Sequence, residues 1–285
     1  MKSTVKKRIA IAVAAVFVLV CGLVYVVPDR IIFRNVDDPA SREFLRDKPA
    51  YHEVGFTSEN GTTYHGMMYQ ASDEKAPLII YFGGNLNCSS RHMRSNEESG
   101  QWVYYAGYNY LYMDYEGYGQ NGGRTSYSKM CRQALAVYDW AVSLPNVDSE
   151  CIVTIGYSLG TGCAVYLAAN RPVAGAILAA PYANGYDLFN NVVPVFAGPM
   201  KLLVKQKFAS DKWAPKVECP VLVIASRGDE VVPFSSSARL AGLFPGNVDF
   251  LEVENAHHRG IFNVEGVFER LQSFLAEIKQ TGGLH

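Results

Sequence analysis

The segment that most constrains the fold of this chain is residues 156–160, Gly-Tyr-Ser-Leu-Gly. The apolar run 152–155 before it is typical of a buried strand, and residues 161–169 after it are typical of a helix. A serine with a glycine two positions away on each side, at such a junction, indicates a sharp strand-to-helix turn that large neighbours would block. The turn should lift the Ser158 hydroxyl clear of the sheet, close to the helix N-terminus and the amide of Leu159.

The rest of the chain alternates between the same two kinds of segment. Unbroken apolar runs, typical of strands buried on both faces of a parallel sheet, are 78–82, 110–113, 152–155, 176–179 and 221–224. Helical patterns lie at 90–106, 128–143, 159–170, 235–243 and 261–279. Two segments of alternating polarity, 53–57 and 62–69, come first and flank an Asn-Gly turn. This order predicts an α/β three-layer sandwich with a mostly parallel sheet and an antiparallel hairpin at its start.

The N-terminus differs from everything that follows it. An uncharged run, residues 9–27, is long enough at about 1.5 Å per residue to cross a bilayer core, and it follows the basic residues Lys2, Lys6, Lys7 and Arg8. The run is longer than the apolar part of most cleaved signal peptides, and no small-x-small cleavage site follows it. We therefore expect an uncleaved single-pass transmembrane helix. The basic cluster predicts a cytoplasmic tip, with the main domain on the non-cytoplasmic side, which in a bacterium is the periplasm.

The predicted organisation has four parts. They are a cytoplasmic tip and membrane anchor at 1–28, a connector at 29–50, one α/β domain at 51–279 and a tail at 280–285. Within the domain, the stretch 182–218 is long for a connection between two strands. Two explanations fit it, a small lid over an active site or an extra helix packed on the scaffold, and one insertion can serve as both.

Charge and cysteine content exclude some classes of function. A net charge of −1 gives no reason to expect nucleic acid as a partner. The six cysteines form no Cys-x-x-Cys pair and no Cys/His spacing that suits zinc, so no metal site is expected. Cys151 and Cys163 lie in apolar segments and should be buried. An exported domain can hold a disulfide, for which the sequence proposes no pairing, and Cys88 and Cys131 are expected to be the most accessible thiols.

The partners that a serine nucleophile needs follow two later strands. A serine hydroxyl reacts only when a base takes its proton, and the base needs a carboxylate to orient it, in the chain order serine, carboxylate, histidine. Asp229 follows the run 221–224, and His257 and His258 follow the strand expected at 248–253. Each group also has a purely structural explanation: the aspartate can form a turn, and a histidine can cap the start of a helix. Three matches in the right order, each at a strand end, favour catalysis, although proximity does not choose between the histidines.

The loop after the run 78–82 is the candidate source of a second oxyanion donor. It has the sequence Gly-Gly-Asn-Leu-Asn at 83–87, and glycines let a backbone approach a substrate closely. The amides of Asn85 and Leu159 are therefore the expected oxyanion hole. The alternative is an ordinary glycine-rich turn.

These segments together resemble the α/β-hydrolase superfamily, in particular its membrane-anchored abhydrolase-domain branch, which is similar to serine aminopeptidases. The matching segments are 156–161, Asp114-Tyr-Glu-Gly-Tyr-Gly119, 219–223 and Gly228-Asp229-Glu-Val-Val-Pro233, and the resemblance covers about 51–279. Within it, Asn255-Ala-His-His258 aligns with Gly-Ala-Gly-His, which makes His258 the base and leaves His257 at the pocket rim. Gly83 stands where the family usually has histidine, and Glu116 where it often has arginine.

The resemblance implies a serine hydrolase that cleaves an acyl ester, lipid-like or small, through an acyl-enzyme on Ser158, Asp229 and His258. It implies no metal and no organic cofactor. The expected partners are a small-molecule or lipid substrate and a membrane, through the N-terminal helix. An aminopeptidase or amidase, a thioesterase, and a non-catalytic anchored scaffold are the alternatives. Substrate chain length and oligomeric state do not follow from the sequence.

Overall fold

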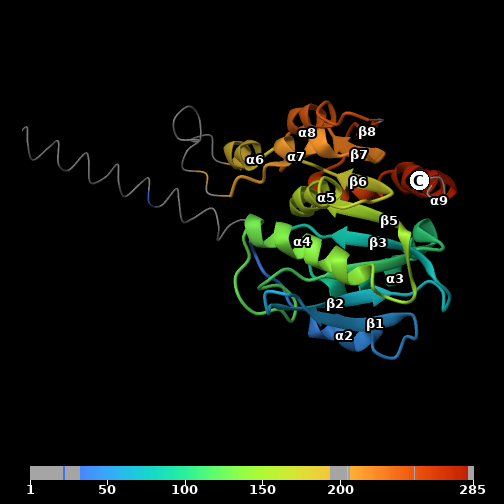
Figure 1. Ribbon diagram of the computed structural model, residues 1–285. Coiled ribbons are helices and arrows are strands. Elements are labelled where there is room, and N and C mark those ends of the chain that lie inside the picture. The colour runs from blue at the N-terminus through green and yellow to red at the C-terminus, as the bar shows by residue number, and fades with distance from the viewer. Residues whose placement is uncertain (1–21, 23–32, 193–203, 205, 247, 282–285) are drawn as a thin grey trace, which may run out of the picture.

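The computed structural model describes residues 22, 33–192, 204, 206–246 and 248–281. Within them, eight strands form one sheet in the order β1-β2-β4-β3-β5-β6-β7-β8 (Figure 1). Their bounds are β1 (Tyr51–Thr57), β2 (Thr63–Tyr69), β3 (Ala76–Phe82), β4 (Asn109–Met113), β5 (Val147–Tyr157), β6 (Gly175–Ala179), β7 (Val221–Ser226) and β8 (Val248–Val253). β2 pairs antiparallel with β1 and β4, and all other neighbours are parallel. The predicted mostly parallel sheet with an initial hairpin is confirmed.

Helices cover both faces of this sheet. The α-helices of the described residues are α2 (Pro39–Leu45), α3 (Ser89–Ser99), α4 (Tyr127–Ala141), α5 (Thr161–Ala168), α6 (Gly185–Val192), α7 (Ser210–Trp213), α8 (Phe234–Ala241) and α9 (Val267–Thr281). Short 3₁₀ turns are η1 (Gln101–Tyr105), η2 (Ser158–Gly160), η4 (Ala214–Lys216) and η5 (His258–Asn263). Buried residues of α4, α5 and α8 share one core with the sheet, and those of α2, α3 and α9 share the other. The molecule is therefore the predicted three-layer sandwich (Figure 1).

The burial of each strand explains why some strands appear in the sequence as continuous apolar runs and others do not. All five residues of β4 and all five of β6 are buried, as central strands covered on both faces require. β1 lies at one edge of the sheet and has mostly exposed or half-buried residues. Its link to β2 is the predicted Asn-Gly turn, in which Gly61 has φ +81° and its N–H donates to Ser58 O at 2.8 Å.

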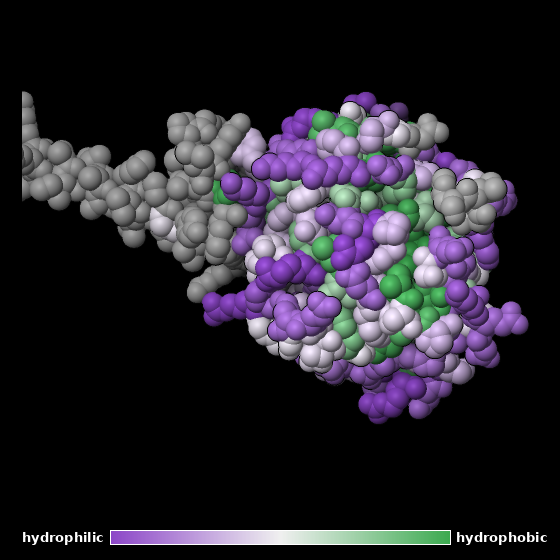
Figure 2. Space-filling view, in the orientation of Figure 1, coloured by the Kyte–Doolittle hydropathy of each residue, from purple (hydrophilic) through white to green (hydrophobic). Residues whose placement is uncertain are grey.

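The helix α4 shows how a surface helix meets its two environments. Ser126 caps its N-terminus by accepting a hydrogen bond from the Lys129 amide. Ser128, Arg132 and Asp139 are exposed at helical spacing, while the opposite side of α4 lies in the core. The face of the molecule in Figure 2 is accordingly mostly hydrophilic, with hydrophobic side chains visible between the polar ones.

The segment expected to be a connector contains a helix and packs on the domain. Asp38 caps α2 by accepting from the Ser41 amide, with Pro39 in the first turn. Phe33 packs against the core with its ring centroid 6.0 Å from that of Phe208. The described part of this segment is thus packed on the domain, with Leu45 in one core and Phe33 against the other.

The cysteine thiols are buried more deeply than the sequence predicted at two positions. Cys88, Cys131, Cys151, Cys163 and Cys219 are free thiols. Cys151 and Cys163 are buried as predicted, but the expectation that Cys88 and Cys131 are the most accessible is wrong, since they are 0% and 6% exposed. The reason is that Cys88 lies at the N-cap of α3, next to the buried Ser89 and Ser90, and that Cys131 is among the buried residues of α4.

Two predicted segments fall partly or wholly outside the described residues. The expected anchor at 9–27 lies outside them apart from Gly22, and none of the helices the structure describes is long and apolar enough to span a bilayer. Of the expected lid at 182–218, the structure describes α6, α7, η4 and the residues next to them. The anchor and the lid both remain predictions.

Candidate active site

Ser158 lies at the turn between β5 and α5, and the backbone there has the strain that the sequence predicted. Its φ is +50°, which residues with a side chain rarely adopt. A Cβ on Gly160 would lie 2.0 Å from Phe82 O, and one on Gly156 would lie 2.6 Å from Thr161 Cα. Both glycines are therefore required by close backbone approach. The result is a half-buried serine held above the carboxyl end of the central strand.

The structure brings Ser158, His258 and Asp229 together in one chain of contacts. His258 Nε2 lies 2.8 Å from Ser158 Oγ, and His258 Nδ1 lies 2.8 Å from Asp229 Oδ2. With a neutral ring, Nδ1–H donates to the carboxylate and Nε2 accepts from the serine hydroxyl. The side chains of His258 and Asp229 are 9% and 2% exposed, so little water competes for these contacts. This geometry is the one that activates a serine hydroxyl.

The carboxylate of Asp229 is fixed on both oxygens. Its Oδ1 accepts hydrogen bonds from the amides of Val231 and Val232, both at 2.8 Å. Its Oδ2 is thereby left to face the His258 ring. The loop after β7 thus fixes the orientation of the carboxylate that faces His258.

His258 is held by two further residues that the sequence analysis did not single out. Glu230 Oε2 accepts from the His258 amide at 3.1 Å, and this contact lowers the pKa of the Glu230 carboxyl. The hydroxyl of Tyr157 donates to His258 O at 2.9 Å, and its ring lies 5.4 Å from the imidazole at an angle of 25°. Tyr157 is a variable position of the turn motif, and Glu230 is one of two adjacent acids, so neither carried a signal in the sequence.

The neighbouring histidine lies in a different environment. The side chain of His257 is 86% exposed, and its Nδ1 lies 3.4 Å from Glu230 Oε2. It lies beside the active-site loop and faces solvent, whereas His258 faces Ser158. Of the two candidates for the base, the structure therefore brings His258 to the serine.

The loop that was expected to supply a second oxyanion donor passes directly beside the serine. We call residues 83–86 the oxyanion loop. A Cβ on Gly84 would lie 3.4 Å from Ser158 Cβ, so this backbone borders the Ser158 side chain. Within the part of the chain that the structure describes, no hydrogen bond uses the amide N–H of Asn85 or Leu159. Leu159 O accepts from the Tyr182 hydroxyl at 2.9 Å, which holds that peptide in place.

The departure from the family pattern at Gly83 has a structural cause. A side chain at Gly83 would meet Tyr112 Oη at 1.8 Å, so the tyrosine occupies the space where the usual histidine would lie. The other departure, Glu116, forms an ion pair with Lys129. At both positions, the residue that departs from the family pattern lies against a residue from another segment, Tyr112 for Gly83 and Lys129 for Glu116.

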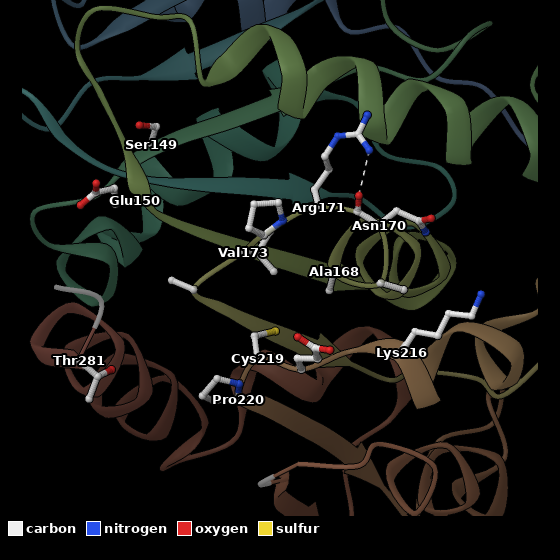
Figure 3. Close-up of a pocket in the computed structure, with 14 residues that line it drawn as sticks. Ser149, Glu150, Ala168, Asn170, Arg171, Val173, Lys216, Cys219, Pro220 and Thr281 are labelled. Carbon is white, nitrogen blue, oxygen red and sulfur yellow. Dashed lines mark hydrogen bonds between the residues drawn. The ribbon is translucent and has the colours of Figure 1, made fainter. Parts of the chain in front are cut away.

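No side-chain cluster suited to a metal ion occurs among the described residues. A cavity of about 760 Å³ does occur, but it lies where β5, β6 and β7 begin, away from the strand ends that carry Ser158 (Figure 3). Its charged residues are two acids and two bases, Glu150, Glu218, Arg171 and Lys216. Arg171 is also paired with Asp139. The cavity therefore has neither the position nor the free charge of a site for the Ser158 chemistry.

Comparisons with known proteins agree with this architecture. The model of the dienelactone hydrolase family matches residues 116–254, a range that contains Ser158 and Asp229. An uncharacterised protein of Mycobacterium tuberculosis is 28% identical over 82% of both chains. The Caenorhabditis elegans alpha/beta hydrolase domain-containing protein aho-3 is 31% identical over 57% of this chain and 47% of its own. Among solved structures, the Pyrococcus furiosus esterase Pf2001 has a TM-score of 0.68 at 19% identity, covering 86% of this chain and 98% of that one.

The family match, the alpha/beta hydrolase domain-containing relatives and the fold agree with the resemblance to the α/β-hydrolase superfamily. The sequence relatives and the fold support a hydrolase.

Proposed function

We propose that the protein is a serine hydrolase that cleaves acyl esters, with Ser158 as nucleophile, His258 as general base and Asp229 as the group that orients the base. The observation that carries the proposal is the pair of 2.8 Å contacts that joins these three side chains. The strained turn at Ser158 supports it further, since a φ of +50° on a non-glycine residue is most often retained where function requires it.

The reaction follows from this geometry in two balanced halves. Ser158 Oγ attacks the ester carbonyl as its proton passes to His258 Nε2, and Asp229 stabilises the imidazolium that forms. The proton then passes to the leaving oxygen, the ester C–O bond breaks, and an alcohol departs from the acyl-enzyme. Water then gives its proton to His258 and attacks the acyl carbon, and Ser158 recovers its proton as the carboxylic acid leaves. The amides of Leu159 and Asn85 are proposed to stabilise the oxyanion in both halves, since neither has a partner among the described hydrogen bonds.

We also propose that residues 9–27 anchor the protein, with the catalytic domain on the non-cytoplasmic side. The Arg34 amide lies 2.9 Å from the Asn85 side chain, so residue 34 is next to the oxyanion loop. Six residues, 28–33, separate it from the end of the apolar run, and the seven steps from residue 27 to residue 34 reach at most about 25 Å. An anchored enzyme would therefore keep its active site near the bilayer surface. This proximity favours a lipid-like acyl ester as the substrate.

A fluorophosphonate probe tests the nucleophile. Wild-type protein should be labelled, Ser158→Ala should not be, and Ser128→Ala should be labelled like the wild type, because Ser128 is an exposed serine of α4. Retained labelling of Ser158→Ala would exclude the proposed nucleophile. Wild-type protein that takes no label and hydrolyses no ester would favour the non-catalytic scaffold.

The substrate class is tested with p-nitrophenyl esters of increasing acyl length. A lipid-like substrate predicts that kcat/KM rises from acetyl to octanoyl, because each buried CH₂ contributes about 0.8 kcal/mol. A maximum of kcat/KM at acetyl would exclude a lipid-like substrate and would leave the proposal of an esterase standing. Faster cleavage of aminoacyl p-nitroanilides or of thioesters would instead select an amidase or a thioesterase.

A further inference from the structure

The side chain of Asn85 is the meeting point of three hydrogen-bond donors. Its Oδ1 accepts from the Arg34 amide at 2.9 Å, from the Leu86 amide at 3.0 Å and from the Tyr118 hydroxyl at 3.1 Å. A carbonyl oxygen has two lone pairs, so three donors saturate it and fix the orientation of the carboxamide. The Leu86 amide belongs to the loop itself, whereas Arg34 and Tyr118 come from two other segments of the chain, so the loop is also held from outside.

The backbone of the oxyanion loop is held by another tyrosine of the segment that contains Tyr118. Gly83 O accepts from the Tyr115 hydroxyl at 3.0 Å, and Leu86 has φ +61°. Because the Leu86 amide is already bound to Asn85 Oδ1, it is unavailable to a substrate. The Asn85 amide has no such partner among the described residues. The network therefore uses the Gly83 carbonyl, the Asn85 side chain and the Leu86 amide, and it leaves the Asn85 N–H without a partner among the described residues.

One of the holding segments is the chain just before α2. We call residues 33–36 the strap. Its Arg34 amide binds Asn85, and its Val36 carbonyl accepts from the Gly119 amide at 2.9 Å. Gly119 follows Tyr118 directly, so the strap and the 114–119 loop hold each other while both hold Asn85. Phe33 packs on Phe208 at the start of the strap.

We propose that the strap and Tyr118 are positioning elements for the oxyanion site, and that they act through the side chain of Asn85. They touch no reacting atom. They set the direction of the Asn85 amide, which is useful only if it points to the place where negative charge develops. This inference rests on the proposed function, and it makes the segment after the predicted anchor a working part of the active site.

Hydroxyl deletion at Tyr118 is the first test. Tyr118→Phe keeps the buried ring and removes one donor to Asn85. The matched control is Tyr138→Phe, which removes a similarly buried hydroxyl that donates to Pro172 O near the start of β6. Full loss of an oxyanion donor lowers kcat by about 10²–10³-fold, so partial misplacement should lower it about tenfold. KM should change less than twofold, and the pH dependence of kcat/KM should stay that of wild type, because the Ser158–His258 contact is untouched.

The strap is tested by removing its donor. Arg34→Pro deletes the amide N–H, and its kcat is compared with that of Arg34→Ala, which keeps the N–H and lacks the same side chain. The ratio of the two should be about ten, again with KM nearly constant.

A double-mutant cycle then shows whether these effects pass through Asn85. Asn85→Ala keeps the amide and loses the acceptor, so Tyr118→Phe and Arg34→Pro should each have almost no further effect on kcat in that background. Full additivity, a shifted pH profile, or equal effects of Tyr118→Phe and Tyr138→Phe would overturn the inference. Failure of the proposed function is recognised separately, because the wild-type protein would then be inactive or Ser158→Ala would keep its activity.

Discussion

Asp114, a buried carboxylate directly after β4, allows a prediction of how protein stability changes with pH. Asp114 is 4% exposed, and its two oxygens accept from the amide and the hydroxyl of Ser89, each at 2.7 Å. Burial raises the pKa of Asp114 from 3.8 to about 6, because the two hydrogen bonds only partly offset the loss of hydration. The folded state therefore binds this proton more tightly than the unfolded state does. The stabilisation is present below about pH 4 and is lost as the pH rises through about 6.

The substitution Asp114→Asn removes the charge and keeps the shape. The amide oxygen can accept from the Ser89 N–H, and the amide nitrogen can donate to the Ser89 hydroxyl. Moving the pKa of Asp114 from 3.8 to about 6 corresponds to about 3 kcal/mol. At pH 8 the free energy of unfolding of Asp114→Asn should therefore be about 3 kcal/mol higher than that of the wild type. Near pH 4, where the wild-type carboxyl is protonated, the two proteins should differ by less than about 1 kcal/mol.

Urea unfolding followed by tryptophan fluorescence at pH 4, 6 and 8 measures this difference. The control is Asp47→Asn, an exposed aspartate for which the change should stay within about 0.5 kcal/mol at each pH. A variant less stable than wild type at pH 8 would refute the reasoning. A gain of equal size at pH 4 would also refute it, since the gain would then not come from ionisation.

Three other predictions follow from the same structure. His258→Ala should lower kcat by several orders of magnitude, as Ser158→Ala would, while exposed His257→Ala should cost far less; a steady-state assay that found the reverse order would reassign the base. Gly160→Ala should destabilise the fold by about 3 kcal/mol or more in thermal unfolding, because its Cβ would lie 2.0 Å from a backbone oxygen, whereas Gly246→Ala, with nothing closer than 3.8 Å, should be nearly neutral. A reporter fused to the C-terminus should be active only outside the cytosol, and deletion of residues 1–28 should leave a soluble, active enzyme with its strap intact; a cytosolic signal would reverse the proposed topology.

Local patterns were sufficient for most of the fold. The apolar runs became β3 to β7, and the turn motif between β5 and α5 carries Ser158 as expected. Asp229 and the pair His257 and His258 could be placed together with Ser158 because residues that follow parallel strands gather at one edge of the sheet, and the family resemblance then selected His258. Burial on both faces of a strand leaves a continuous apolar run in the sequence, and a strained turn leaves glycines, so these features can be read without coordinates.

Contacts between distant segments could not be read in this way. Nothing near Gly83 in the sequence shows that Tyr112 fills the space above it, and nothing near residue 34 shows that its amide binds Asn85. Cys88 was expected to be accessible, yet it is 0% exposed at the N-cap of α3. The sequence by itself determined the layers and the edge of the sheet at which Ser158, Asp229 and the two adjacent histidines lie. Only the tertiary structure decided how those groups are held, because their supports are brought close by packing and leave no periodic pattern in the chain.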